Sequence, residues 1–252
     1  MTLQSSGQIS ISDVNLELGY ASTRNTNLNE FEVRALFGKP SGLISLLDGY
    51  GKNLIGSASY TWTGAATIFG QNTQEYIFNV PFYKGLYVEI RGGGGGGGNG
   101  SNVAFDGTNR RNGASSYGTE LNWNGGINGT GIILGATGGN GGSGTAGASS
   151  GSNGNGFGGS GITGVTAVSG GGGVGGNGGI GSFWSGSRGG NGGFASKTFI
   201  RGETKSPDPY STLRVRIGGP GPNSAAFQTQ PAGTVVGQDG SPGFPGVYFY
   251  WY

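Results

Sequence analysis

Glycine is distributed unevenly along this chain of 252 residues, and its distribution restricts the possible folds more than any other feature. Of the 62 glycines, 43 fall within residues 92–193. A segment with so few side chains cannot form an ordinary hydrophobic core, and glycine loses more backbone freedom on folding than any other residue. Ordering about a hundred such residues costs on the order of 100 kcal/mol of conformational entropy. The segment is therefore either a flexible linker or a structure stabilised by contacts between backbones.

The rest of the composition favours the ordered alternative. Disordered chains have few aromatic residues and a high net charge, whereas this chain is 11% aromatic with a formal net charge of +2. Bulky residues such as Trp123, Phe157 and Trp184 interrupt the glycine runs, and a flexible insert of this length is rare within a compact domain. We expect extended helices with about three residues per turn, packed side by side as a polyglycine-II bundle, because only glycine lets backbones approach so closely.

Strand-like sequences lie on both sides of the glycine-rich segment. The six predicted strands cover residues 60–63, 76–80, 86–91, 194–201, 213–217 and 247–252. Three of them alternate apolar with other residues, the period-two pattern of a strand with one buried face. The residues expected to face the core in these three are Leu86, Val88, Ile90, Leu213, Val215, Ile217, Val247, Phe249 and Trp251. The pattern predicts a mainly β fold with a small β-sandwich, in which Glu89 pairs with Arg214 or Arg216 across strands.

The N-terminal part of the chain contains a near-repeat of short helical sequences. Helices are expected to open near Ile11, Leu28 and Ile44, each with a Ser or Asn as N-cap followed by acidic residues. Gly19 and Gly38 close the first two as C-terminal stops. Helices this short are unstable alone, so they must pack on each other, on a partner chain or on a larger assembly.

In the second of these helices, Phe31, Ala35 and Leu36 are expected to share one face. A docking segment is the favoured interpretation of the whole N-terminal part, and a small self-contained helical cap is the alternative. The predicted organisation is a short-helix docking segment at residues 1–56 and a β-sandwich domain at residues 57–252, with the polyglycine-II-like insert at residues 92–193.

The residue types that the chain lacks argue against most catalytic and metal chemistry. Histidine and cysteine are absent, which excludes Ser–His nucleophiles, imidazole or thiolate metal sites and disulfides. The 12 acidic residues form no recurring pair of the kind that glycosidases use. Asp106, Asp208 and Asp239 are isolated, unlike the ligands of a calcium loop. We therefore predict no enzymatic activity, no cofactor and no bound metal.

Charge and hydropathy also exclude two kinds of partner. The near-neutral balance does not provide the clustered Lys and Arg that nucleic-acid binding needs. No stretch approaches 18 consecutive apolar residues, and the first ten residues lack the basic and apolar regions of a signal peptide. We expect neither nucleic-acid binding nor membrane insertion.

The order of these segments resembles the glycine-rich domain of bacteriophage tail fibres and fibre-tip adhesins. The matching features are a strand at residues 86–91 running directly into the glycines of 92–98, Asn191-Gly192-Gly193 leading into residues 194–199, the strand and glycines of 213–219, and Gly240-Ser241-Pro242-Gly243 leading into 247–252. Residues 7–19 and 41–52 are similar to the starts of many phage virion proteins. The resemblance covers most of the chain.

The resemblance implies a virion protein of the tail or its fibres, made in the host cytoplasm and acting as a receptor-binding adhesin. Its partners would be other tail, baseplate or fibre proteins through residues 1–56, further copies of the chain in a homotrimer, and a host surface glycan or outer-membrane protein through loops of the glycine domain. Aromatic loop residues suit such contacts, and the receptor-contact candidates are Phe105, Tyr117, Trp123, Phe157, Phe183, Trp184 and Arg188. The virion-docking candidates are Val14, Leu16, Leu18, Phe31, Leu36, Phe37, Leu46 and Leu47.

Other functions remain open on the sequence. A purely structural tail-tip, collar or fibre spacer would need the same fold without receptor contact, and the aromatic candidates would then pack against the glycine helices. Ice-binding proteins also use polyglycine bundles, but the bulky stretches at residues 101–134 and 180–188 would spoil the flat face that ice binding needs. The adhesin is the preferred prediction.

Overall fold

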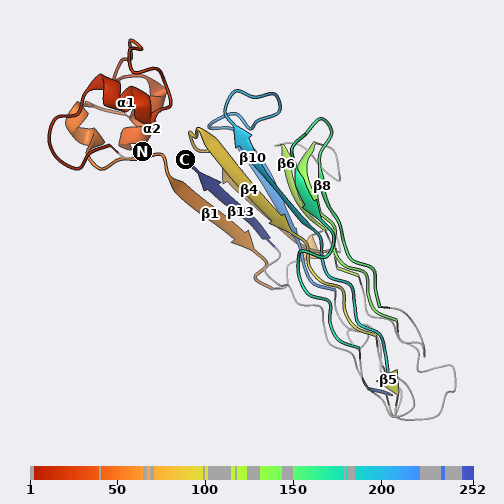
Figure 1. Ribbon diagram of the computed structural model, residues 1–252. Coiled ribbons are helices and arrows are strands. Elements are labelled where there is room, and N and C mark those ends of the chain that lie inside the picture. The colour runs from red at the N-terminus through yellow and green to blue at the C-terminus, as the bar shows by residue number, and fades with distance from the viewer. Residues whose placement is uncertain are drawn as a thin grey trace.

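The computed structural model describes residues 3–39, 41–64, 67–68, 71–98, 100–101, 115–116, 118–123, 131–143, 150–178, 180, 185–221, 234–235 and 246–252. It is mainly β, with two antiparallel sheets and few helices (Figure 1). The helical elements α1 (Ile11–Glu17), α2 (Phe31–Phe37) and the 3-10 helix η1 (Leu46–Gly49) all precede the first strand. Over these described ranges, no helix has the length and apolar character to cross a membrane.

Both sheets combine strands from distant parts of the chain. The five-stranded sheet has the order β1 (Gly56–Thr61), β13 (Gly246–Trp251), β4 (Gly85–Arg91), β10 (Phe194–Ile200) and β9 (Thr166–Val168). The six-stranded sheet has the order β2 (Thr67–Ile68), β3 (Gln71–Asn79), β11 (Thr212–Gly218), β6 (Thr119–Trp123), β7 (Ile132–Ala136) and β8 (Gly156–Gly158). A small additional sheet pairs β5 (Gly100–Ser101) with β12 (Thr234–Val235). All six predicted strands are present, as β1, β3, β4, β10, β11 and β13, although β1 and β3 begin earlier than predicted.

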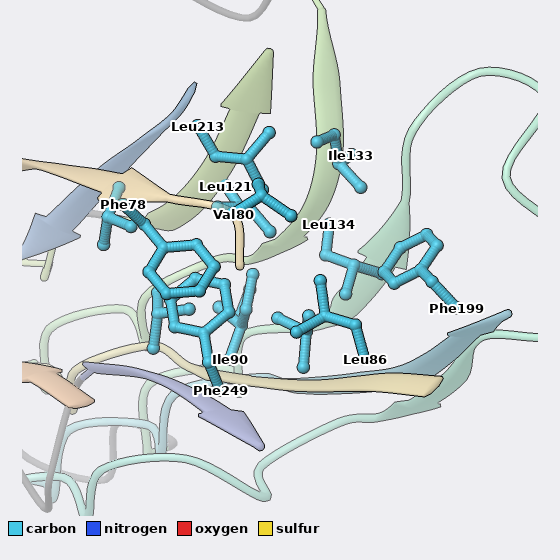
Figure 2. Close-up of a cluster of buried hydrophobic side chains, with 14 of the residues drawn as sticks. Phe78, Val80, Leu86, Ile90, Leu121, Ile133, Leu134, Phe199, Leu213 and Phe249 are labelled. Carbon is cyan, nitrogen blue, oxygen red and sulfur yellow. The ribbon is translucent and has the colours of Figure 1, made fainter. Parts of the chain in front are cut away.

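The hydrophobic core lies between the two sheets (Figure 2). The predicted inward residues of β4, β11 and β13 are buried, except that Trp251 is only partly buried. Phe78 from one sheet stacks on Phe249 from the other, with ring centroids 3.8 Å apart and an interplanar angle of 13°. Burying each large apolar side chain contributes about 1.5–3 kcal/mol, so this core is the main source of side-chain stabilisation in the β domain.

Two core strands come from inside the glycine-rich segment, where no strand was predicted. β6 and β7 contribute Leu121, Ile133 and Leu134, all fully buried, to the core of the six-stranded sheet. Each strand has only five residues, and glycine-rich sequence surrounds both. A pattern this short cannot be recognised without the neighbouring strand β11 against which β6 pairs. Their presence means that the glycine-rich segment is partly built into the sheets.

The predicted pairing of Glu89 with Arg214 or Arg216 is wrong. Glu89 lies on β4 in the five-stranded sheet, where its carboxylate is 2.6 Å from the Arg91 guanidinium. Arg214 lies on β11 in the other sheet, 3.7 Å from the Glu75 carboxylate. The two strands have the same alternation, but the chain assigns them to opposite sheets, so their polar faces point away from each other.

Of the three predicted helix starts, only the first is confirmed: α1 begins at Ile11, whereas α2 begins at Phe31 and not near Leu28, and the third element is a 3-10 helix that begins at Leu46 and not at Ile44. The backbone N–H of Ser10 donates to the Asp13 carboxylate (2.8 Å), and the Ser10 hydroxyl accepts from the Asp13 N–H (3.3 Å). Ser45 forms a second capping box at the start of η1. α2 differs, because its N-cap is Glu30 and that side chain makes no capping hydrogen bond. The stop at Gly38 is confirmed by its left-handed backbone, with φ of 68°.

The helical elements form a cluster of their own, here called the helical cap (residues 3–54). Its buried side chains are Leu3, Ile9, Val14, Leu18, Val33, Leu36, Phe37 and Leu54, joined by Phe82 from the linker between β3 and β4. The predicted face of α2 is wrong in part: Leu36 is buried, but Phe31 is 56% exposed and Ala35 is exposed. Helical spacing allowed either stripe, and packing in the cap core, where the Phe37 ring lies against Gly49 of η1, buries the more apolar one, formed with Val33 and Phe37.

The cap sits at one end of the two sheets, here called the cap end. The Lys84 ammonium donates to the Leu16 carbonyl (3.0 Å), and the Arg201 guanidinium donates to the Leu18 carbonyl (3.4 Å). Arg201 also lies over the Phe82 ring, 4.3 Å from its centroid. These contacts tie the cap to the β3–β4 linker and to the turn after β10. The start of β1 and the end of β13 lie beside each other at this end of the sheet (Figure 1).

Candidate functional site

At the opposite end of the sheets, several glycine-rich segments run side by side away from the cap (Figure 1). β4 ends at Arg91, and residues 92–98 continue it as a segment in which every residue is buried. The amides of Gly92, Gly95 and Gly98 donate hydrogen bonds of 2.9–3.0 Å to residues 187–193. The donors to this neighbour therefore recur at every third residue.

Other extended segments surround residues 92–98. Carbonyl groups of this central segment accept hydrogen bonds of 2.8–3.0 Å from residues 139–142, 173–176 and 221. The spacing is again three, since Gly93 and Gly96 are the acceptors for one neighbour. Buried backbone groups must be paired, and here other backbones pair them. We call the described segments 92–98, 137–143, 150–155, 172–178, 186–193 and 219–221 the glycine lattice.

Most inward positions of the glycine lattice have no room for a side chain. A Cβ added to Gly95 would overlap the carbonyl oxygen of Asn140, and one added to Gly94 would overlap that of Val174. Gly93 is less crowded, because its added Cβ would lie 3.2 Å from the nearest atom, the Gly219 carbonyl oxygen. The glycines are therefore a packing requirement set by backbone approaching backbone, as the sequence predicts for an ordered segment.

Two tyrosines with shifted pKa values lie in the β3–β4 linker and in the turn between β10 and β11. Burial, with a smaller effect of Asp208, raises the pKa of Tyr83 to about 12, and burial raises that of Tyr210 to about 12. Hydrogen bonds from Ser10 lower the pKa of Asp13. In the ranges that the structure covers, no three acidic side chains gather closely enough to hold a metal ion. The described segments of the glycine lattice contribute mainly backbone, and Arg188 is the one ionisable side chain in them.

The receptor-contact candidates are divided by the structure. Phe105, Tyr117, Phe183 and Trp184 lie outside the described residues. Arg188 is part of the glycine lattice, where its guanidinium donates to the Gly175 carbonyl (3.1 Å) and the Asn191 side chain (3.4 Å). Trp123 and Phe157 belong to strands β6 and β8 and not to loops, which corrects the expectation from sequence. They meet at one cleft.

This aromatic cleft has a volume of about 390 Å³, and its lining includes Trp123, Ile132, Phe157, Gly159, Ser160 and Lys205. It lies at the cap end, because Trp123 pairs with Leu213 at the start of β11. The Phe157 ring stands over Gly135, whose missing side chain leaves space for it. Two backbone hydrogen bonds fix the walls: Trp123 N–H donates to the Gly131 carbonyl (3.0 Å) and Gly159 N–H to the Ile133 carbonyl (2.9 Å).

Lys205 was not predicted as a site residue, and no sequence signal identifies it. It lies in the turn between β10 and β11 with φ of 65°, a left-handed backbone that residues other than glycine rarely adopt. Its side chain is exposed and makes no hydrogen bond or ion pair within the described part of the chain. The only other such residue among those described is Tyr210, with φ of 66°.

The virion-docking candidates fall into two groups. Val14, Leu18, Leu36 and Phe37 are buried in the core of the helical cap, and Leu46 packs against that core while partly exposed. Leu16, Phe31 and Leu47 are 43%, 56% and 69% exposed, so these are the candidates that a partner could contact. Leu43, which is not among the predicted docking residues, is 96% exposed. Helical periodicity could not separate these groups because each helix has only two turns.

Comparison with known proteins gives no relative: no protein-family model, no curated protein and no solved structure matches the chain.

Proposed function

We propose that this chain is a bacteriophage tail or tail-fibre protein that acts as a non-enzymatic, host receptor-binding adhesin at the tail or fibre tip. One observation carries the proposal: the glycine lattice projects from the sheets on the side away from the helical cap (Figure 1). The described hydrogen bonds at every third residue fit polyglycine-II helices, which have three residues per turn. In this proposal they form a bundle that continues a β-sandwich.

A lattice of this kind suits mechanical display. Ordering it costs on the order of 1–2 kcal/mol per residue, and it provides a stiff rod in return. Its six described segments carry one ionisable side chain, Arg188, which is already bonded within the lattice. The proposed host contacts are therefore at the far end, through the loops that connect the segments, with a surface glycan or an outer-membrane protein as the receptor.

The helical cap is the proposed attachment to the particle. Its exposed apolar side chains Leu16, Phe31 and Leu47 offer a surface to a tail, baseplate or fibre protein. Packing of such side chains against a partner would contribute about 25 cal/mol for each Å² of apolar surface removed from water. The protein would be made in the host cytoplasm and carried in the virion, with a homotrimer as the proposed assembly.

Adsorption experiments separate the adhesin from a purely structural spacer. Particles that carry Trp184→Ser are expected to assemble normally and to adsorb to host cells more slowly, and the purified wild-type chain is expected to compete with particles for adsorption. Ser57→Ala, on the exposed edge strand β1, is the matched control and should leave adsorption unchanged. Normal adsorption of the Trp184→Ser particles together with no competition by the purified chain would favour the spacer.

A further inference from the structure

The aromatic cleft at the cap end has features that the proposed display rod does not need. It lies at the opposite end of the sheets from the glycine lattice, and its rings come from β6 and β8. We propose that this cleft binds a sugar ring that carries a carboxylate. The proposal does not depend on whether the chain belongs to a virion, because it concerns a different end of the molecule.

The two rings supply the apolar part of the site. Trp123 packs partly on the main core and Phe157 rests over Gly135, so both rings are held from behind while they line the cleft. The C–H faces of a pyranose ring are apolar and pack on aromatic surfaces, which combine a large contact area with little conformational freedom to lose. The hydrogen-bonded walls make the cleft largely pre-formed, which lowers the entropic cost of binding.

Lys205 supplies the charge. None of the described residues that line the cleft is acidic, and the Lys205 ammonium has no partner within the same described part of the chain. Its left-handed backbone is one that residues other than glycine rarely adopt. The methylenes of Lys205 pass Gly161, 3.6 Å from where a Cβ on that glycine would lie. A ligand carboxylate would complete a charge-assisted hydrogen bond at this position.

The size and polarity of the cleft fit one sugar residue of a larger chain. Its volume of about 390 Å³ lies at the lower end of the range of ligand pockets. Ser160 adds a hydroxyl group that can both donate and accept, as the many hydroxyl groups of a sugar require. A neutral sugar would form no ion pair with Lys205, and a lone phosphate would make no apolar contact with the rings of Trp123 and Phe157.

Ligand-observed NMR on the full-length protein tests the proposal. The probes are methyl β-D-glucuronide, methyl β-D-glucoside and inorganic phosphate. We expect saturation transfer from the protein to the glucuronide, at least tenfold weaker binding of the glucoside, and no displacement by equimolar phosphate. Tenfold corresponds to about 1.4 kcal/mol, which is within reach of one hydrogen bond to a charged group.

Two variants assign the binding to the cleft. Lys205→Asn keeps a residue that tolerates the left-handed backbone, so it should stay folded and bind the glucuronide at least tenfold more weakly. Lys52→Asn, which removes an exposed lysine of the helical cap, is the matched control and should bind like the wild type. Phe157→Leu should reduce binding of both sugars, because it removes the ring that both would contact.

Each remaining outcome overturns the proposal. Equal binding of glucuronide and glucoside would show that the carboxylate is not recognised. Displacement by phosphate would show a simple anion site, and unchanged binding by folded Lys205→Asn would place the ligand elsewhere. Absence of saturation transfer from the wild-type protein to either sugar at millimolar concentration would remove the site altogether.

Discussion

The two halves of the β domain are stabilised in different ways although the same chain segments run through both. In the sheets, Arg91 on β4 pairs with Phe194 on β10. One residue further, Gly92 donates to Gly193, and the same two segments continue side by side into the glycine lattice. Inside the sheets, side chains on alternate residues bury apolar surface. Inside the lattice, the N–H and C=O groups of neighbouring backbones pair in hydrogen bonds that recur at every third residue.

The difference shows that two paired segments can change from the two-residue period of a strand to a three-residue period and still lie side by side. The alternating apolar residues stop at Ile90, and an unbroken run of seven glycines begins at residue 92. Because glycine has no side chain, other backbones can approach such a segment from several sides. Residues 92–98 therefore form hydrogen bonds with more than two neighbouring segments, whereas a strand in a sheet pairs with at most two. Removing side-chain volume should therefore destabilise the sheets. Adding side-chain volume should destabilise the lattice.

The largest effect is expected from truncating a core ring. Phe249→Ala removes one member of the stacked pair between the two sheets and leaves a cavity, so it should lower the free energy of unfolding by about 3–5 kcal/mol. Tyr250→Ala, on the neighbouring and 44% exposed residue, is the control and should cost less than about 1 kcal/mol. Urea unfolding measures both. Equal losses would contradict the placement of the core between the sheets.

The opposite change tests the glycine lattice. Gly95→Ala forces a methyl group into the Asn140 carbonyl, so it should cost about 1–3 kcal/mol or more by overpacking. Gly93→Ala, two residues away in the same segment, has 3.2 Å of clearance and should cost less. Hydrogen exchange of the lattice amides locates the effect. If Gly95→Ala and Gly93→Ala behave alike, close backbone approach does not stabilise this segment.

The sequence was sufficient where local pattern decides structure. Alternation placed the core faces of β4, β11 and β13, and glycine at the end of α2 marked its stop. The sequence was insufficient where contacts with distant segments determine which residues form a strand and which sheet that strand joins. β6 pairs with the distant strand β11, and β7 pairs in turn with β6. Glu89 lacks the predicted partner because β4 and β11 belong to different sheets. Lys205 joins the cleft through a turn conformation that its residue type does not encode.

A smaller effect is expected in the helical cap, where single hydrogen bonds set the ends of short helices. Ser10→Ala removes the hydroxyl that accepts from the Asp13 N–H, so it should destabilise the cap by about 0.5–2 kcal/mol. Ser12→Ala in the first turn of the same helix should be neutral or slightly stabilising, because alanine is the better helix former. Exchange rates of the cap amides measure both variants. A loss of protection with Ser12→Ala equal to that with Ser10→Ala would rule out the capping role.

The smallest effect depends on pH and should separate the cap from the glycine lattice. Hydrogen bonds from Ser10 and Ser45 lower the pKa of Asp13 and Asp48 in the folded cap. A carboxyl group whose pKa is lower in the folded state stabilises that state above its unfolded pKa, about 3.9, and this contribution is lost as pH falls through the folded value. Protection of the cap amides, corrected for intrinsic exchange, should therefore weaken below about pH 4, and Asp13→Asn should reduce this dependence. The described lattice segments contain only Arg188 as an ionisable side chain, which stays protonated throughout, so their protection should stay constant. A parallel loss in both regions would show that the lattice depends on the cap for its stability and not on its own backbone contacts.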